Sequence, residues 1–211
     1  MTARRRRPER ARRHRFHQSQ TRINDMHWID PDSLPETRGK VTRFLLNPHG
    51  EIDGLVLGAR QALQVHFPPH LSRQISRQVA VGDDVRVRGV KPRGANMIAA
   101  VSLVTKSGRV ILDEGPHHDG AKHDKPHVER KPMDASGEVL LSLYGPKGEL
   151  RGALLDDGTS LRMPPHAAAE LAAYLAPGAH VQAWGHGIRN RHGRTIEVDE
   201  IAELIDAPVP A

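Results

Sequence analysis

The chain has 211 residues, of which 37% are hydrophobic and only 3% aromatic, and its formal net charge is +6. It contains no cysteine, which excludes disulfides, thiol chemistry and cysteine-based zinc sites. No run of about 18 apolar residues is present and the N-terminus lacks the apolar core of a signal peptide, so we expect a cytoplasmic protein without membrane spans.

The positive charge is concentrated at the N-terminus. Residues 1–22 carry nine arginines and one glutamate, a net charge of +8, so the rest of the chain sums to −2. One interpretation is a disordered basic arm for nucleic acid or an anionic membrane surface. The other is that translation begins at Met26 and that the arginine-rich stretch is read-through of upstream sequence. In both cases we expect residues 1–37 to be a tail and lead-in without a core.

A first β-rich unit is predicted over 38–105. Its expected strands, in chain order, cover 40–46, 51–57, 62–67, 85–90 and 97–104. A pair of prolines ends the third strand, and a helix is expected over 70–80, because Leu71, Ile75 and Val79 repeat at helical spacing.

The same pattern returns later in the chain. Residues 65–70, Val-His-Phe-Pro-Pro-His, recur at 161–166 as Leu-Arg-Met-Pro-Pro-His. The turn pattern Pro-x-Gly-Glu, followed by Ile or Leu, any residue and Gly, occurs at 48–54 and at 146–152. The repeat predicts a second unit of the same kind over 136–206, with its helix over 165–176.

The segments outside the two units are polar. Residues 106–135 read as a linker without core-forming residues, and 207–211 as a short tail. The linker contains four histidines that are weak candidate metal ligands, since a histidine-rich tract can bind nickel or zinc. These are His117, His118, His123 and His127. The simpler interpretation is a polar linker that binds nothing.

Five short strands with one helix between the third and fourth resemble the OB fold, a five-stranded Greek-key barrel. The chain is thus similar to bacterial tandem OB-fold (oligonucleotide/oligosaccharide-binding) proteins. The resemblance implies a mainly β fold of two tandem five-stranded OB-like barrels. It also implies a ligand surface on strands two and three and the loops after strands one and four. In the first unit these are residues 47–50, the third strand around His66, and 91–94.

The two units differ in charge. Residues 36–112 carry a net charge of +7, whereas 136–206 carry −4, so the first unit is the candidate polyanion binder. Within it, the densest basic cluster is formed by a strand and the turn that follows. With His66 as a fifth candidate contact, the expected nucleic-acid-binding residues are Arg86, Arg88, Lys91 and Arg93. The alternative is that these cations are the solvated face of an amphipathic strand.

The sequence contains no phosphate-binding loop, paired catalytic carboxylates or nucleophile–base motif, so we expect a protein that is not an enzyme and needs no cofactor. The first hypothesis is a protein that binds single-stranded DNA or RNA through its basic first unit. The scarcity of aromatic residues weighs against it, because single-strand binders stack bases on such rings. The second is a protein-interaction or assembly module that pairs a basic with an acidic unit. A weaker third is a regulatory domain that senses a small anion or a metal ion.

Overall fold

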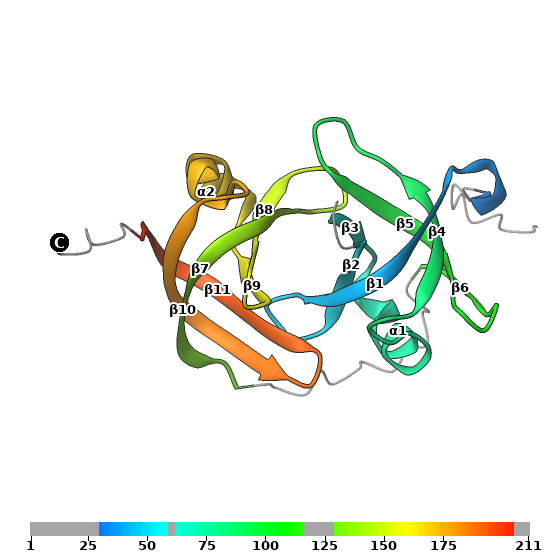
Figure 1. The fold of residues 1–211 in the computed structure, drawn as a ribbon, viewed down its shortest axis with the longest axis horizontal. Helices are drawn as coiled ribbons and strands as arrows, with labels where there is room; N and C mark the ends of the chain where they lie inside the picture. Colours follow the sequence, from blue (N-terminus) through cyan, green and yellow to red (C-terminus); the bar gives the residue numbers. More distant parts are fainter. Residues whose placement is uncertain (1–29, 59–61, 116–128, 205–211) are drawn as a thin grey trace, which may run out of the picture.

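The computed structural model describes residues 30–58, 62–115 and 129–204. Within them the chain forms two closed β-barrels that lie side by side (Figure 1). The mainly β fold with two tandem barrels is therefore confirmed. The N-terminal arginines and the four linker histidines lie outside the described residues.

The first barrel is built from five strands. They are β1 (Glu36–Leu46), β2 (Ile52–Leu57), β3 (Leu63–His66), β4 (Asp84–Val90) and β5 (Met97–Val104). β1 pairs antiparallel with β2 and β4, and the ring closes because β3 pairs in parallel with β5. This is the strand order of the OB fold, because strands three and five meet only in a closed five-stranded Greek key.

The second barrel repeats the order. Its strands are β7 (Lys131–Tyr144), β8 (Leu150–Leu155), β9 (Thr159–Arg162), β10 (His180–Asn190) and β11 (Gly193–Glu203). The parallel pair that closes this ring is β9 with β11. The predicted repeat is therefore a repeat of whole barrels.

A short helical segment follows the third strand in both copies, where the paired prolines cannot donate to a strand ladder. In the first barrel a 3₁₀ turn (Pro69–Leu71) leads into α1 (Ser72–Gln78). In the second, α2 (Pro165–Glu170) is followed by a 3₁₀ turn (Ala172–Leu175). The helices are shorter than the expected 70–80 and 165–176, because each segment is partly 3₁₀.

Two glycines repeat because another backbone passes close to them. A Cβ on Gly89 would lie 2.2 Å from the Ala99 carbonyl oxygen, and one on Gly185 would lie 2.0 Å from the Glu197 carbonyl oxygen. Both follow a bulge in the fourth strand of their barrel, between residues 88 and 89 and between 184 and 185. Only glycine lets the strand pass its neighbour there.

The expected linker over 106–135 is narrower than the sequence indicated. A sixth strand, β6 (Val110–Leu112), pairs with β5, and its Ile111 side chain is 1% exposed in the core of the first barrel. At the other end, β7 already begins at Lys131 and pairs with β10 from there on. The apolar Val-Ile-Leu run was too short to stand out beside the polar residues around it.

The barrels also pack against each other, and an apolar surface, which the charge difference between the units does not predict, forms part of the contact. A separate apolar cluster joins Leu45 and Val56 of the first barrel to Leu143 and Leu154 of the second, together with Leu141. Leu45 and Leu143 occupy the same position in the repeat, as do Val56 and Leu154. Each barrel therefore uses the outward face of its first two strands to cover the same face of the other.

Candidate functional site

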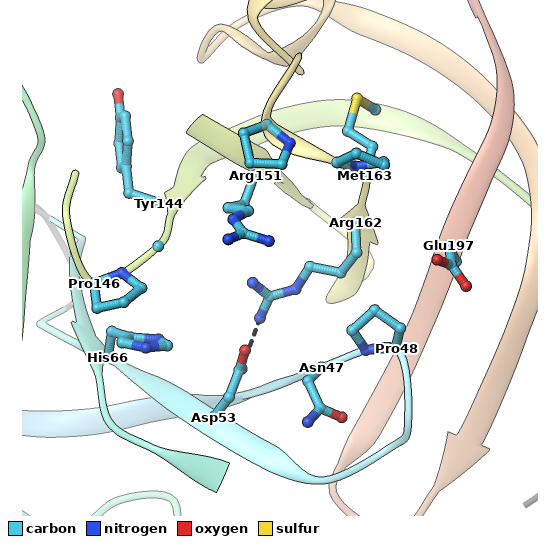
Figure 2. A pocket seen from close by; sticks show the side chains of 13 residues that line it. Asn47, Pro48, Asp53, His66, Tyr144, Pro146, Arg151, Arg162, Met163 and Glu197 are labelled. Atoms are coloured by element: carbon cyan, nitrogen blue, oxygen red, sulfur yellow. Dashed lines mark hydrogen bonds and ion pairs between the residues drawn. The ribbon is translucent and has the colours of Figure 1, made fainter. Parts of the chain in front are cut away.

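A pocket of about 380 Å³ lies where the two barrels meet (Figure 2). Its apolar walls are mostly prolines, Pro48, Pro146, Pro164 and Pro165, with Met163. Its polar groups come from both barrels and include Asn47, Asp53, His66, Arg151, Arg162 and Glu197. A hollow of this size with a few convergent polar groups is typical of a small-ligand site.

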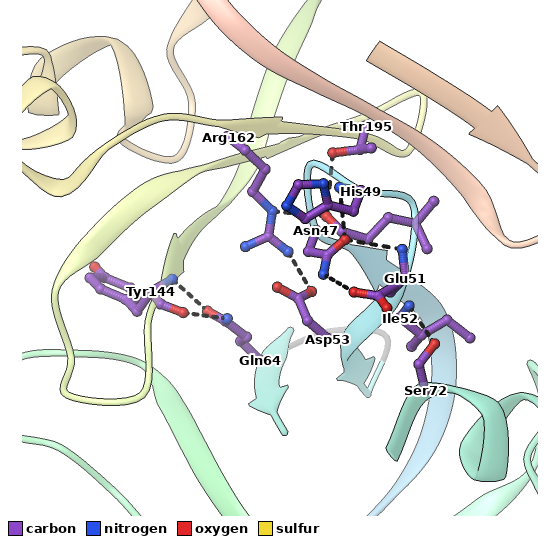
Figure 3. Close-up of polar contacts among 11 residues, drawn as sticks. Asn47, His49, Glu51, Ile52, Asp53, Gln64, Ser72, Tyr144, Arg162 and Thr195 are labelled. Atoms are coloured by element: carbon purple, nitrogen blue, oxygen red, sulfur yellow. Dashed lines mark hydrogen bonds and ion pairs between the residues drawn. The ribbon is translucent and has the colours of Figure 1, made fainter. Parts of the chain in front are cut away.

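A buried ion pair forms the floor of this pocket. Arg162 Nη2 donates to Asp53 Oδ1 at 2.7 Å, and Arg162 Nε donates to the Leu46 carbonyl oxygen at 3.0 Å. The same carbonyl accepts from Thr195 Oγ1 at 3.3 Å (Figure 3). Every one of these contacts crosses from the second barrel to the first, so the floor of the pocket exists only while the barrels are together.

His66 stands beside Pro146 on the pocket wall (Figure 2). Its Nδ1 atom is buried and has no hydrogen-bond partner among the described residues. Burial lowers the pKa of His66, and Asp53 only partly opposes this effect. The lowered pKa favours the neutral ring, so His66 lines the pocket as an uncharged side chain whose buried Nδ1 has no hydrogen-bond partner among the described residues.

The loops of each barrel reach across to the other. The Asn190 side chain donates from Nδ2 to the Gly50 carbonyl oxygen at 2.8 Å, and the Phe44 and His192 rings meet edge to face at 5.5 Å. On the other side, a Cβ on Gly148 would lie 2.8 Å from the Pro92 Cβ. In both places the loop between the fourth and fifth strands of one barrel meets the loop between the first and second strands of the other.

The pair of loops around Pro92 and Gly148 gathers exposed cations. Lys91 and Arg93 belong to the first barrel and Lys147 to the second, and all three are exposed. None of the three forms an ion pair with a carboxylate in the described ranges. We call Lys91, Arg93 and Lys147 the seam cations. Pro146, next to Lys147, lines the pocket, so the loop that carries Lys147 also forms part of the pocket wall.

The structure divides the basic cluster expected from the sequence. Lys91 and Arg93 are exposed at the seam, and His66 lines the pocket. Arg86 and Arg88 lie on the outward face of β4, as the alternation predicts. Arg88, however, donates from Nη1 to the Asp32 and Leu34 carbonyl oxygens and pairs with Glu36, so it holds the lead-in segment.

The face that the OB resemblance implied as the ligand surface of the first barrel is largely covered. Asn47 is 8% exposed, and the Gln64 side chain exchanges two 2.8 Å hydrogen bonds with the Tyr144 backbone of the second barrel (Figure 3). What stays open on this face is the pocket around His66.

The sequence did not identify Asp53, Arg151 and Arg162 as pocket residues, nor Lys147 as one of the seam cations. A signal was present in the repeat itself. The position that is Asp53 in the first copy is Arg151 in the second, and His66 aligns with Arg162. At these two positions the polar residues that change charge between the copies lie in the pocket where the barrels meet.

The described residues contain no group of three or more His, Cys, Asp or Glu side chains placed to hold a metal ion. No helix in the described ranges is long and apolar enough to cross a membrane.

Comparison with known proteins finds no matching protein family and no matching curated sequence. Among solved structures, the chain is similar to the single-stranded DNA binding protein from Thermus aquaticus, at 14% identity and a TM-score of 0.28 over 83% of this chain and 94% of that one. A deletion mutant of that protein aligns at 14% identity and a TM-score of 0.27, over 83% and 95% of the two chains. At TM-scores this low, the alignments add nothing to the strand order described above.

Proposed function

We propose that this chain is a non-enzymatic protein that binds single-stranded DNA or RNA along the seam between its barrels. The observation that carries the proposal is the group of three exposed seam cations, Lys91, Arg93 and Lys147, on two loops from different barrels that meet at Pro92 and Gly148. Phosphates supply most of the binding free energy in such complexes, and unpaired cations contact them with little desolvation cost.

The proposed path of the nucleic-acid strand differs from the one expected from the sequence. A strand that ran across β2 and β3 of the first barrel would meet the second barrel, because Gln64 and Asp53 on that face are already bonded to it. A strand that follows the seam meets Lys91 and Arg93 on one side and Lys147 on the other. Arg86, which is exposed on β4, extends the cationic path on the first barrel.

The test compares two triple variants of the full chain in binding to single-stranded DNA and to single-stranded RNA. Alanine at Lys91, Arg93 and Lys147 should weaken binding by tens-fold or more at moderate salt and lower the log–log salt slope by about 2 to 3. The matched control is alanine at Arg73, Arg77 and Arg109, which are also exposed but lie away from the seam. Because both variants keep the N-terminal arginines, their difference reports the seam alone.

If both variants lost the same amount of binding affinity, only a nonspecific attraction between the nucleic acid and a basic protein would remain. The absence of binding by the unmodified chain at about 50 mM salt would reject the nucleic-acid function outright.

A second candidate function is a protein-interaction module. It is favoured by two large apolar side chains exposed on the acidic second barrel, Leu140 at 44% and Trp184 at 37%. A module of this kind should change its size in solution with protein concentration when no nucleic acid is present.

A further inference from the structure

Trp184 lies on the outward face of β10 between two carboxylates. In the strand register it is directly opposite Asp134 on β7 and directly opposite Glu200 on β11. Directly opposite residues of antiparallel strands project from the same face with their Cβ atoms about 5 Å apart. Asp134 and Glu200 are both exposed, and neither forms an ion pair with a cation in the described ranges.

This arrangement has the chemistry of a guanidinium site. An indole face attracts a cation placed over it, and arginine does this best because its planar group stacks on the ring and also donates to carboxylates at its edge. The next row of the same face already holds one arginine, because Arg130 pairs with Glu197 beside a hollow of about 280 Å³ that His186 and Asp199 also line.

The equivalent face of the first barrel shows what this part of the fold can hold. Arg88 occupies the position of Trp184 in the repeat, and the chain segment before β1 lies on it. The Arg88 guanidinium donates to the Asp32 and Leu34 carbonyl oxygens at 3.3 and 3.2 Å and pairs with Glu36 at 3.4 Å. In the first copy this face therefore holds the segment before β1, which begins with a 3₁₀ turn (Pro31–Ser33), by charge-assisted contacts.

In the second copy the polarity is reversed. A tryptophan between carboxylates replaces the arginine, so a segment bound there must be cationic. The chain itself provides such a segment, because residues 4–15 contain eight arginines and one glutamate. The first barrel, with its net charge of +7 over 36–112, repels the same segment.

We infer that the Trp184 face, meaning Trp184 with Asp134 and Glu200, binds the arginine-rich N-terminal segment of the same chain. Fifteen residues separate Arg15 from Asp30, enough for an extended reach of about 50 Å. Arginines nearer the N-terminus reach further. The inference does not depend on the nucleic-acid function, because the Trp184 face and the seam use different residues.

Fluorescence of Trp184 in the full chain tests this directly. The chain has only two tryptophans, Trp28 and Trp184, so W28F leaves Trp184 as the single reporter. In this background, glutamine at Arg4, Arg5, Arg6 and Arg7 should raise the acrylamide quenching constant of Trp184 about twofold, because a docked guanidinium shields the indole. About 0.5 M NaCl should have the same effect on the W28F chain, since it screens exposed charges.

The matched control is glutamine at four exposed cations of the first barrel, Arg73, Arg77, Arg86 and Arg109, which should leave the quenching constant unchanged. A synthetic peptide of residues 2–16, added to the four-glutamine tail variant, should restore the shielding. It should fail to do so when the same chain also carries D134N and E200Q, because the carboxylates that fix the guanidinium are then neutral.

Three results would overturn the inference. The first is an unchanged quenching constant in the tail variant, and the second is an equal change in the control. The third is a constant that rises when the W28F chain is diluted about a hundredfold, because contact within one chain does not depend on concentration. That last result would assign the bound segment to a second copy.

Discussion

Arg162 of the second barrel donates to Asp53 of the first at 2.7 Å, and the two side chains are only 7% and 10% exposed. The barrels are thus joined by an ion pair that water hardly reaches, in an interface that also contains an apolar cluster and the hydrogen bonds of Gln64 with the Tyr144 backbone. A buried pair of this kind contributes little by itself, but removing one member leaves a charge with no partner.

Alanine at Arg162 should therefore lower the free energy of unfolding by about 3 to 5 kcal/mol, as measured by urea denaturation. The control is alanine at Arg151, which lines the same pocket but is exposed and paired with Glu149 at 3.1 Å. That change should cost about 1 kcal/mol or less. Replacing both partners, with D53L and R162M, should cost less than R162A alone. A double variant that costs as much as the two single changes together would contradict the uncompensated-charge account.

Limited proteolysis should cut the chain first between the two barrels, within 113–130, because this stretch is polar and β7 begins at Lys131. The structure adds a second expectation. The two fragments should remain together during gel filtration, because the Leu45–Leu143 cluster and the Arg162 pair still join them. Fragments that elute separately under native conditions would show that the interface is weaker than its burial indicates. A first cut inside β10 or β11 would contradict the two-barrel division itself.

Arg86 and Arg88 should behave differently although they share a strand face. Alanine at Arg88 removes the contacts that hold residues 32–36 and should cost about 1 kcal/mol, with faster amide hydrogen exchange in the lead-in. Alanine at Arg86, whose side chain has no hydrogen-bond or ion-pair partner in the described part of the chain, should change stability by less than about 0.5 kcal/mol. Equal effects of the two substitutions would show that the lead-in is not anchored at Arg88.

The pKa of His66 predicts a specific pH dependence. Burial lowers this pKa below its ordinary value of 6.5, and Arg162 acts in the same direction while Asp53 opposes it. The unfolded chain therefore takes up the proton first, so stability is complete above pH 6.5 and falls as the pH drops from 6.5 towards the lower folded-state pKa. His192, whose pKa is lowered by burial and by Arg191, contributes with the same sign.

Thermal midpoints measured from about pH 7.5 to about pH 5.5 should thus decrease in the unmodified chain and decrease less in H66Q. Parallel decreases in the two proteins would show that His66 is not a source of the pH dependence.

The strand order could be predicted from the sequence because local chemistry determines it. Turn glycines, the proline pairs at 68–69 and 164–165, and the alternation in β4 each specify one element without reference to the rest of the chain. The repeat then confirmed each assignment a second time. β6 was not predicted, because three consecutive apolar residues are too few to show a strand alternation.

The barrel–barrel contact could not be obtained in this way, because it depends on which outward faces meet. A hint was present in β2 and β8. All six residues of β2 are buried, as are the last four of β8. Each strand ends in three consecutive apolar residues, at 55–57 and 153–155, and such runs are typical of strands covered on both sides. The alternation of apolar and polar residues predicts that one face of each strand is exposed to solvent. It therefore does not predict the barrel–barrel contact or the pocket beside it.

The exposure of the expected contact residues could be predicted only in part. Charge density identified Lys91 and Arg93, which are exposed, but it could not separate them from Arg88. The acceptors that engage Arg88 are mostly backbone carbonyls of the lead-in, and no side-chain pattern announces them. Lys147 was overlooked because it belongs to the acidic copy, and only the folded chain places it beside Pro92.

The matching positions of Leu45 and Leu143, and of Val56 and Leu154, give this interface the form of a homodimer contact enclosed in one polypeptide. In a true homodimer every contact occurs twice with identical residues. Covalent linkage removes that restriction. Asp53 pairs with Arg162, whereas the mirrored positions hold Arg151 and His66, which form no such pair with each other among the described residues, and all four side chains line the same pocket. The apolar centre of the contact therefore follows the repeat, while the polar groups of the pocket beside it differ between the two copies and break that two-fold relation.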